Sequence, residues 1–200
     1  ESLRDVVIIL ASNRPYLIDP AVLRPGRIDR KIKVGRPNKD AAAEILKVYM
    51  TAELPLDPVL VEEQGGGQSQ AVASLVQDII ESIFRRTEDN RLLSLKLRSG
   101  QTKVLYRGDL VSGAILASIV QRAKEKAIDR TIQSGQPSGL LAKDLLDAVG
   151  EEFREGEMLP PDDAAEEWLK LLDHHPEQVV GISSFRRGRQ TEERLVNQII

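Results

Sequence analysis

The sequence predicts an α/β fold that is mainly helical, and three observations lead to this prediction. A continuous β-branched and apolar run at Val6–Leu10 has the composition of a central strand in a parallel sheet. Apolar residues recur at helical spacing through much of the later chain, and alternation around a Ser-Gly turn marks a β-hairpin at Arg91–Tyr106. Aromatic residues make up only 4% of the chain, so the core must rest on Leu, Ile, Val and Ala, which favours helices.

Two strands and a hinge are expected in the first part of the chain. After Val6–Leu10, the run KIKV at Lys31–Val34 predicts a second short strand, which is closed by Gly35, Arg36 and Pro37. A helix is expected over Asp40–Met50 with Asn38 as its N-cap, because N-cap positions favour Asn. Its predicted buried face consists of Ala42, Ile45, Leu46 and Tyr49.

Helical periodicity predicts further helices beyond the LPLDP turn. Ser112 is the expected N-cap of the longest of them and Gly135 its C-terminal stop. The predicted buried face of this helix consists of Ile115, Ile119, Ala123, Ala127 and Ile128. The remaining elements expected along the chain are helices at Gln70–Arg86, Ser112–Gln133, Leu140–Phe153 and Ala164–Leu172 and a strand at Gln178–Phe185.

Composition excludes several function classes. The formal net charge is −3, so bulk electrostatics give no reason to expect nucleic-acid binding. The chain has no cysteine, which rules out disulfides and thiolate metal sites and is compatible with a cytoplasmic location. No apolar stretch approaches the roughly 20 residues that span a bilayer, so no membrane association is expected.

One segment carries the strongest functional signal. The twenty residues Ala11–Arg30 read ASNRPYLIDPAVLRPGRIDR, with a polar Asn13 directly after the apolar run and two arginines, Arg24 and Arg27, across a Pro-Gly turn. This string resembles the second region of homology of classical AAA ATPases. The resemblance implies that the chain starts with the C-terminal strands of an AAA+ P-loop core, followed by a mainly helical lid subdomain with an inserted β-hairpin.

The resemblance assigns roles to three residues of this segment. Asn13 would be sensor 1, whose amide binds the γ-phosphate or the attacking water; the alternative is an Asn that starts a turn before Arg14-Pro15. Arg24 and Arg27 would be arginine fingers, since a guanidinium presents a rigid donor fork that suits a phosphate across a subunit interface. The alternative is a pair of surface arginines bonded to Asp19 or Asp29.

A second group of candidate residues begins the longest predicted helix. The family places Ser112, Gly113 and Ala114 beside the nucleotide, where a small residue lets the backbone approach adenine and ribose closely. The alternative is an ordinary N-cap followed by glycine at a helix start.

The resemblance narrows when the later segments are included. EDNRLL, KVLYRGDLVSGAILASIVQRAKEKAI, SGQPSGLLAKDLLDAV and VVGISSF are similar to the actinobacterial proteasomal ATPases of the Mpa or ARC family. Membership implies a cytoplasmic homo-hexamer that unfolds proteins tagged with the ubiquitin-like modifier Pup and feeds them to a 20S proteasome. The expected domains are 1–36 as the end of the nucleotide-binding α/β subdomain, 37–158 as the lid with the hairpin near 91–106, and 159–200 as a C-terminal extension.

The ATP site itself is expected to lie mostly outside these residues. No G-x-x-x-x-G-K-[ST] motif occurs, and no apolar strand that ends in Asp-Glu precedes Val6. ATP and Mg²⁺ would therefore be bound mainly by an N-terminal part that this chain lacks, and the chain alone is not expected to hydrolyse ATP. The family's docking tail, Gly-Gln-Tyr-Leu, has no counterpart in Asn197–Ile200, so 20S binding is expected to differ or to require further residues.

The two histidines, the tryptophan and one basic run are interpreted as having no binding or catalytic role. His174 and His175 have no third ligand at metal spacing and are expected in a solvated turn, Trp168 is expected in the core, and the basic run Arg186–Arg189 in a flexible solvated segment. Two rival functions remain open: another classical AAA unfoldase of the Cdc48 or membrane-protease type, and a nucleotide-free assembly module. A zinc protease is disfavoured because no H-E-x-x-H occurs.

Overall fold

The computed structural model describes residues 6–12, 18–22, 24, 26–28, 30–63, 67–155, 169, 178–186 and 189–195. The chain forms two compact units, Glu1–Gly35 and Arg36–Ile200. The predicted helix at Ala164–Leu172, with Trp168, and the His174-His175 pair lie outside the described residues, apart from the buried Leu169.

Neither predicted strand of the first unit is formed. Residues 6–12 and 30–35 have no regular secondary structure. The apolar side chains of Val7 and Ile9 are 86% and 87% exposed, and that of Val34 is 91% exposed. The strand predictions at Val6–Leu10 and Lys31–Val34 are therefore wrong for this chain. A strand requires neighbours for its backbone hydrogen bonds and its apolar faces, and the described part of this unit supplies none.

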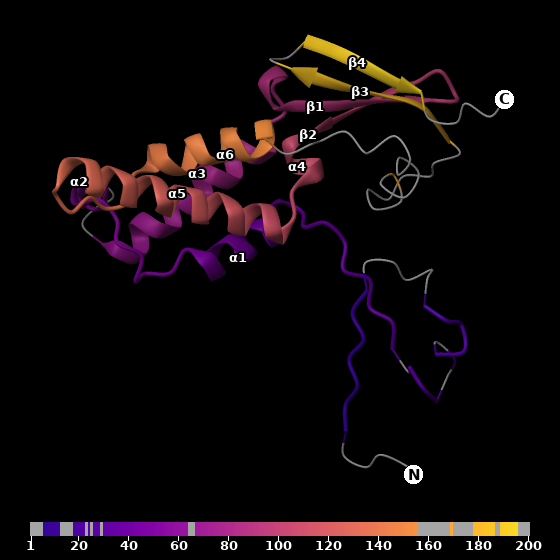
Figure 1. Cartoon of the computed structure of the whole chain (residues 1–200), viewed down its shortest axis with the longest axis horizontal. Coiled ribbons are helices and arrows are strands. Elements are labelled where there is room, and N and C mark those ends of the chain that lie inside the picture. The colour runs from indigo at the N-terminus through magenta and orange to yellow at the C-terminus, as the bar shows by residue number, and fades with distance from the viewer. Residues whose placement is uncertain are drawn as a thin grey trace. The chain divides into compact units, whose positions relative to one another are not determined.

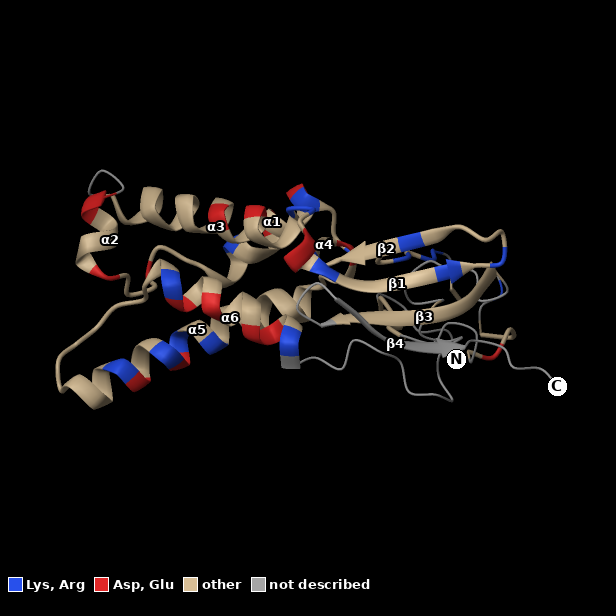
Figure 2. Ribbon diagram, turned by 90° about the horizontal axis from the view of Figure 1, so that it is seen from above, with Lys and Arg blue, Asp and Glu red and all other residues tan. Residues whose placement is uncertain are grey.

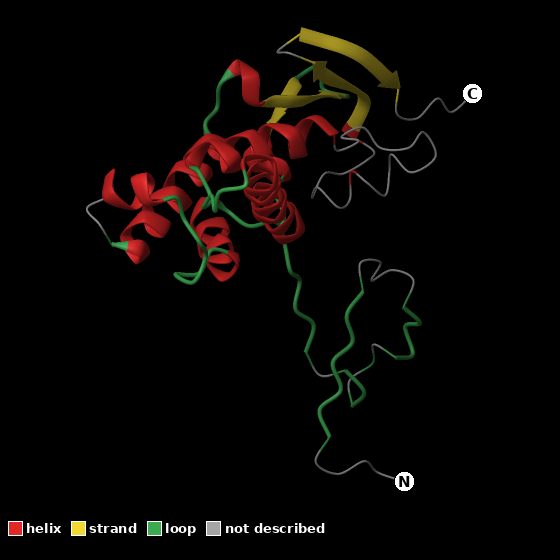
Figure 3. Cartoon of the chain, turned by 60° about the vertical axis from the view of Figure 1, so that its left-hand side comes forward, coloured by secondary structure: helices red, strands yellow, loops and turns green. Residues whose placement is uncertain are grey.

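The second unit is a helical bundle with a small sheet at one end, next to α4 (Figure 1). The helices and the strands form separate groups within this unit (Figure 3). Its helices are α1 (Lys39–Tyr49), α2 (Pro58–Glu63), α3 (Gln68–Phe84), α4 (Arg107–Leu110), α5 (Gly113–Ser134) and α6 (Ala142–Glu155), with a short 3-10 helix at Glu88–Asn90. None of the helices in the described residues is long and apolar enough to cross a membrane.

The helix ends follow the predicted capping chemistry. The side chain of Asn38 accepts a hydrogen bond from the backbone N–H of Ala41 at 2.8 Å, and Ser112 Oγ accepts one from Ile115 at 3.3 Å. Gly135 ends α5 with φ +65°, a left-handed conformation that favours glycine. All three predicted caps are confirmed, because local side-chain chemistry decides them.

The sheet has four antiparallel strands in the order β2-β1-β3-β4. Its strands are β1 (Arg91–Leu97), β2 (Thr102–Tyr106), β3 (Val179–Arg186) and β4 (Arg189–Leu195). The predicted hairpin is confirmed as β1 and β2, joined at Gly100 with φ +85°. The Gln178–Phe185 strand is confirmed as β3, but the sequence analysis missed β4. Arg186 in β3 pairs with Arg189 in β4, so the flexible-segment interpretation is wrong for these two residues, and Arg187 and Gly188 lie outside the described residues.

The core lies among α1, α3, α5, α6 and β1. On α5 the predicted face is mostly correct: Ile119 is buried, but Ile128 is 57% exposed. On α1, Tyr49 is 40% exposed and Met50, the next residue, is only 2% exposed. The largest fully buried side chains are Leu46, Met50, Ile79, Ile80, Ile83, Leu93, Leu95, Leu116, Ile119, Leu140, Leu145 and Leu169.

A close backbone approach joins the loop after α1 to the loop before α6. Leu140 donates its N–H to Pro55 O at 2.8 Å and accepts from Asp57 N at 3.1 Å. A Cβ added at Gly139 would lie 2.2 Å from the carbonyl carbon of Leu56. Only glycine fits at this position, so the crossing of the two loops depends on it.

Candidate functional site

The predicted site residues fall into both units. Arg24 and Arg27 lie in the first unit, and Ser112–Ala114 begin α5 in the second. Asn13 lies outside the described residues, so its predicted sensor role stays a prediction.

Two consecutive turns shape the arginine segment. Asp19 Oδ1 accepts from Ala21 N at 2.7 Å and Asp19 O from Val22 N at 2.9 Å, the pattern of an Asx turn. Arg24 O accepts from Arg27 N at 3.1 Å, and Gly26 between them has φ +86°. Because few side chains tolerate this φ, the glycine defines the turn that separates the two arginines.

Arg27 links the two turns. Its Nη1 donates to Ala21 O at 3.0 Å, and both Arg27 and Arg24 are exposed. Neither guanidinium forms an ion pair with Asp19 in the described part of this segment, and Asp29 lies outside it. A guanidinium has five N–H donors in a fork, so the bond to Ala21 is compatible with a second, anionic partner.

The first turn of α5 begins with residues that have small side chains. Ser112 has extended backbone angles, and its carbonyl accepts from Leu116 N at 3.1 Å. A methyl group added at Gly113 would lie 3.9 Å from Cγ2 of Ile45, an ordinary contact, and Ala114 is exposed. The first turn of α5 therefore carries only small side chains at Gly113 and Ala114, of which Gly113 is half-buried.

Arg36 contacts the residues that lead into α5, and the sequence analysis assigned it no functional role. Its Nη1 donates to the carbonyl of Leu110 and to that of Val111, the latter at 3.5 Å. These carbonyls are at the C-terminal end of α4, where backbone acceptors have no partner within the helix. The sequence places Arg36 in the hinge but gives no signal for acceptors more than 70 residues away.

The far end of α5 is held by a charged network. Arg130 binds both carboxylate oxygens of Asp144 at 2.7 and 2.8 Å, and it donates to Gly139 O and Ser138 Oγ at 2.7 Å each. Burial alone would raise the pKa of Asp144, but hydrogen bonds from Arg130 and from the backbone N–H of Leu141 outweigh it and lower the pKa. This network fixes α5 against α6.

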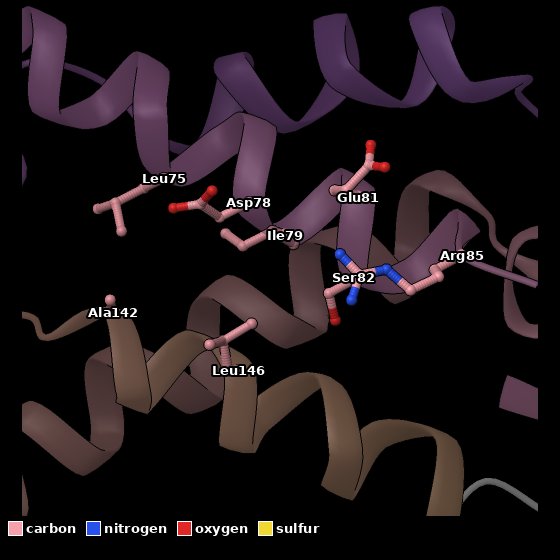
Figure 4. Close-up of a pocket in the computed structure, with 8 residues that line it drawn as sticks. All are labelled: Leu75, Asp78, Ile79, Glu81, Ser82, Arg85, Ala142 and Leu146. Atoms are coloured by element: carbon pink, nitrogen blue, oxygen red, sulfur yellow. The ribbon is translucent and has the colours of Figure 1, made fainter. Parts of the chain in front are cut away.

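A shallow groove lies between α3 and α6, away from the candidate residues (Figure 4). Its volume is about 310 Å³. At its rim, Lys39 bonds Glu81 at 2.5 Å, and this hydrogen bond lowers the pKa of Glu81. The residues that line the groove are Leu75, Asp78, Ile79, Glu81, Ser82, Arg85, Ala142 and Leu146, and none is a predicted site residue.

Charges of both signs are mixed in the part of the chain that the structure describes. Lysines, arginines and carboxylates are interleaved along α5 (Figure 2). Within the described ranges no three His, Cys, Asp or Glu side chains are grouped so that they could hold a metal ion. The residues of this part of the chain therefore do not fit a magnesium centre.

Two segments of the chain match known protein families. Residues 37–199 match the family described as the ARC, AAA+ ATPase lid domain, and residues 1–36 match the ATPase family associated with various cellular activities, AAA. The chain belongs to the ARC family of AAA ATPases. The ARC lid thus covers the helices and the four-stranded sheet, and the AAA match covers the arginine segment.

Relatives of this ARC-family chain cover nearly all of it. It is 41% identical to an "AAA ATPase forming ring-shaped complexes" of Corynebacterium kroppenstedtii over 96% of the chain and 34% of that protein. It is 39% identical to a "Proteasome-associated ATPase" of Saccharopolyspora erythraea over 96% of the chain and 32% of that protein. A "Proteasome-associated ATPase" of Mycobacterium avium is 38% identical over 96% of the chain and 31% of its own length. The chain spans about a third of the length of these relatives.

Proposed function

We propose that this chain supplies the phosphate-sensing segment and the lid of a hexameric ATPase ring that unfolds proteins. The observation that carries the proposal is the match of residues 37–199 to the ARC lid, directly after residues 1–36, which match the AAA family and contain Asn13, Arg24 and Arg27. ARC-family membership favours this function over a Cdc48-type unfoldase.

Arg24 and Arg27 act in this proposal on the nucleotide of a neighbouring subunit. Exposure of both side chains and the positive-φ turn at Gly26 support the role, since a finger must extend from its own subunit. A guanidinium stabilises the charge on the transferring phosphoryl group, and Asn13 orients the γ-phosphate or the attacking water.

Ser112, Gly113 and Ala114 contribute the lid side of the nucleotide site. The small side chains of Gly113 and Ala114 support this role, and the N-cap of Ser112 fixes the direction of the first turn of α5. When ATP is bound, it supplies the phosphoryl-transfer chemistry. Mg²⁺ accompanies ATP in this proposal, and its ligands are not assigned to the described residues, where no three His, Cys, Asp or Glu side chains are grouped so that they could hold the ion.

Proteins tagged with Pup are the proposed substrates, and a 20S proteasome is the proposed partner. The names of the Saccharopolyspora and Mycobacterium relatives, both proteasome-associated ATPases, support proteasome coupling. A second candidate is a ring ATPase that works without the proteasome, which the name of the Corynebacterium relative favours. Pull-down of purified 20S particles by the full-length protein separates the two: retention in the presence of ATP supports the first, and no retention supports the second.

The nucleotide role is tested in the full-length protein with Arg27→Ala. Hydrolysis should fall by about 10³-fold or more while the Kd for ATP changes little, because the finger acts in the transition state. Arg98→Ala is the matched control, since Arg98 is an exposed arginine at the β1–β2 turn. Normal turnover by Arg27→Ala would refute the finger assignment.

A further inference from the structure

The side chain of Arg36 joins two places in the second unit that are far apart in the sequence. Arg36 is the first residue of this unit, and its guanidinium bonds the carbonyls of Leu110 and Val111. Val111 immediately precedes Ser112, the N-cap of α5. Arg36 therefore links the beginning of the lid to the residues just before α5. The N-cap and first residues of α5, Ser112–Ala114, are the candidate nucleotide residues of the lid.

The surroundings make this tie well defined. Leu110 and Val111 are 4% and 0% exposed, so their carbonyls belong to a packed part of the lid. Two residues after Arg36, Asn38 caps α1, and Cγ2 of Ile45 on that helix would lie 3.9 Å from a Cβ added at Gly113 of α5. Arg36 therefore connects the residues just before the first turn of α5 with the residues that lead into α1.

Arginine suits this position because of its geometry. One nitrogen of the guanidinium, Nη1, reaches two successive carbonyls, and its positive charge is favourable at the C-terminal end of α4. A lysine provides the charge at a single flexible point, so it would reproduce the attraction but not the fixed orientation.

We infer that Arg36 is a positioning residue that transmits the nucleotide state at the start of α5 to the hinge between the two units. This inference rests on the proposed nucleotide role of Ser112–Ala114. Arg36 does not touch the reacting atoms in this scheme; it converts a local change at the α5 start into movement of the chain at residues 35 and 36. Its loss uncouples ATP hydrolysis from unfolding.

The test uses full-length rings and a folded fluorescent protein that carries the tag as a genetic fusion. Wild type, Arg36→Ala, Arg36→Lys and the control Lys39→Ala are compared for ATP Kd, ATP turnover, unfolding rate and Tm. Lys39 is a matched control because it lies three residues further along and bonds Glu81 of α3 rather than the α4–α5 connection. Arg36→Ala should bind and hydrolyse ATP within about twofold of wild type, but consume about tenfold more ATP per unfolded protein, because the hydrogen bonds of a charged group to Leu110 and Val111 are lost.

The outcomes discriminate between coupling and simple stability. Arg36→Lys should recover part of the coupling, and both Arg36 variants should keep Tm within a few degrees of Lys39→Ala. Normal coupling in Arg36→Ala overturns the inference, and so does a parallel loss of Tm, ATP turnover and unfolding. Should Arg36→Ala not fold, normal coupling in Arg36→Lys would overturn it. A wild-type ring without ATP turnover would instead refute the proposed function.

Discussion

Asp144 is the buried carboxylate on which the α5–α6 junction depends. It accepts two hydrogen bonds from Arg130 and one from Leu141, and its side chain is 8% exposed. Asp144→Ala should lower the free energy of unfolding by about 2–3 kcal/mol, because Arg130 loses its charged partner in a largely buried site. Urea unfolding of the chain measures this. Asp147→Ala, on the exposed side of the same helix, should change stability by less than about 0.5 kcal/mol; equal effects of the two would contradict the network.

The same residue gives a pH dependence with a defined sign. The pKa of Asp144 is lowered in the folded state below its ordinary value of 3.8. Its contribution to stability is therefore fully present above pH 3.8 and is lost as the pH falls through the lower, folded-state pKa. The difference in unfolding free energy between wild type and Asp144→Asn should be constant from neutral pH to about pH 5 and shrink below about pH 4. A difference that grows on acidification would contradict this assignment.

Individual residues also show where sequence reasoning ends. Arg24, Arg27 and Ser112 were predicted because a motif or a cap preference marks them, and local geometry then followed from Gly26 and the N-cap bond. The Arg36 contact could not be predicted in this way. Its acceptors are backbone carbonyls more than 70 residues away. Every residue has a backbone carbonyl, so the residue types at those positions do not indicate the contact.

At the scale of the elements, Gly135 ends α5 and Gly139 allows two loops to cross. Substitution of each should therefore change the free energy of unfolding by a different amount. Gly135 has φ +65° in open space, so Gly135→Ala should lower the free energy of unfolding by about 1 kcal/mol. At Gly139 a Cβ would meet the backbone of Leu56 and Asp57 within 2.4 Å, so Gly139→Ala should lower it by about 3 kcal/mol as the loops separate. Urea unfolding of both variants checks the order, and a larger effect at Gly135 would contradict the loop crossing.

Element prediction succeeded where local chemistry decides and failed where distant partners decide. The β1–β2 hairpin was predictable because its strands are adjacent and its turn contains Gly100. β4 was missed because RQTEERL is polar and only its pairing with β3 makes it a strand. The opposite error occurred at Val6–Leu10, where strongly β-forming residues remain without a ladder in the described chain.

For the whole molecule, the chain on its own should not turn over ATP. The sequence contains no G-x-x-x-x-G-K-[ST] loop, so nothing in it cradles the β- and γ-phosphates. Phosphate release by the purified 200-residue chain should equal the buffer background. Turnover that co-purifies with the chain through successive columns would show that it contains a complete site.

In the proposed function, Arg27 acts on the nucleotide of a neighbouring subunit within a ring. The most direct measurement mixes full-length wild-type subunits with increasing fractions of Arg27→Ala subunits and follows ATP turnover. Because each Arg27 completes the ATP site of the adjacent subunit, an Arg27→Ala subunit should abolish hydrolysis at that adjacent site. Its own ATP site should stay intact. To isolate that effect, the mutant subunits also carry a disabled phosphate-binding loop, and the comparison mixture carries the disabled loop with Arg27 intact. As the fraction of mutant subunits rises, ATP turnover per wild-type subunit should fall markedly more steeply in the Arg27→Ala mixture than in the comparison mixture. Coincident curves for the two mixtures would contradict a role of Arg27 at the neighbouring site.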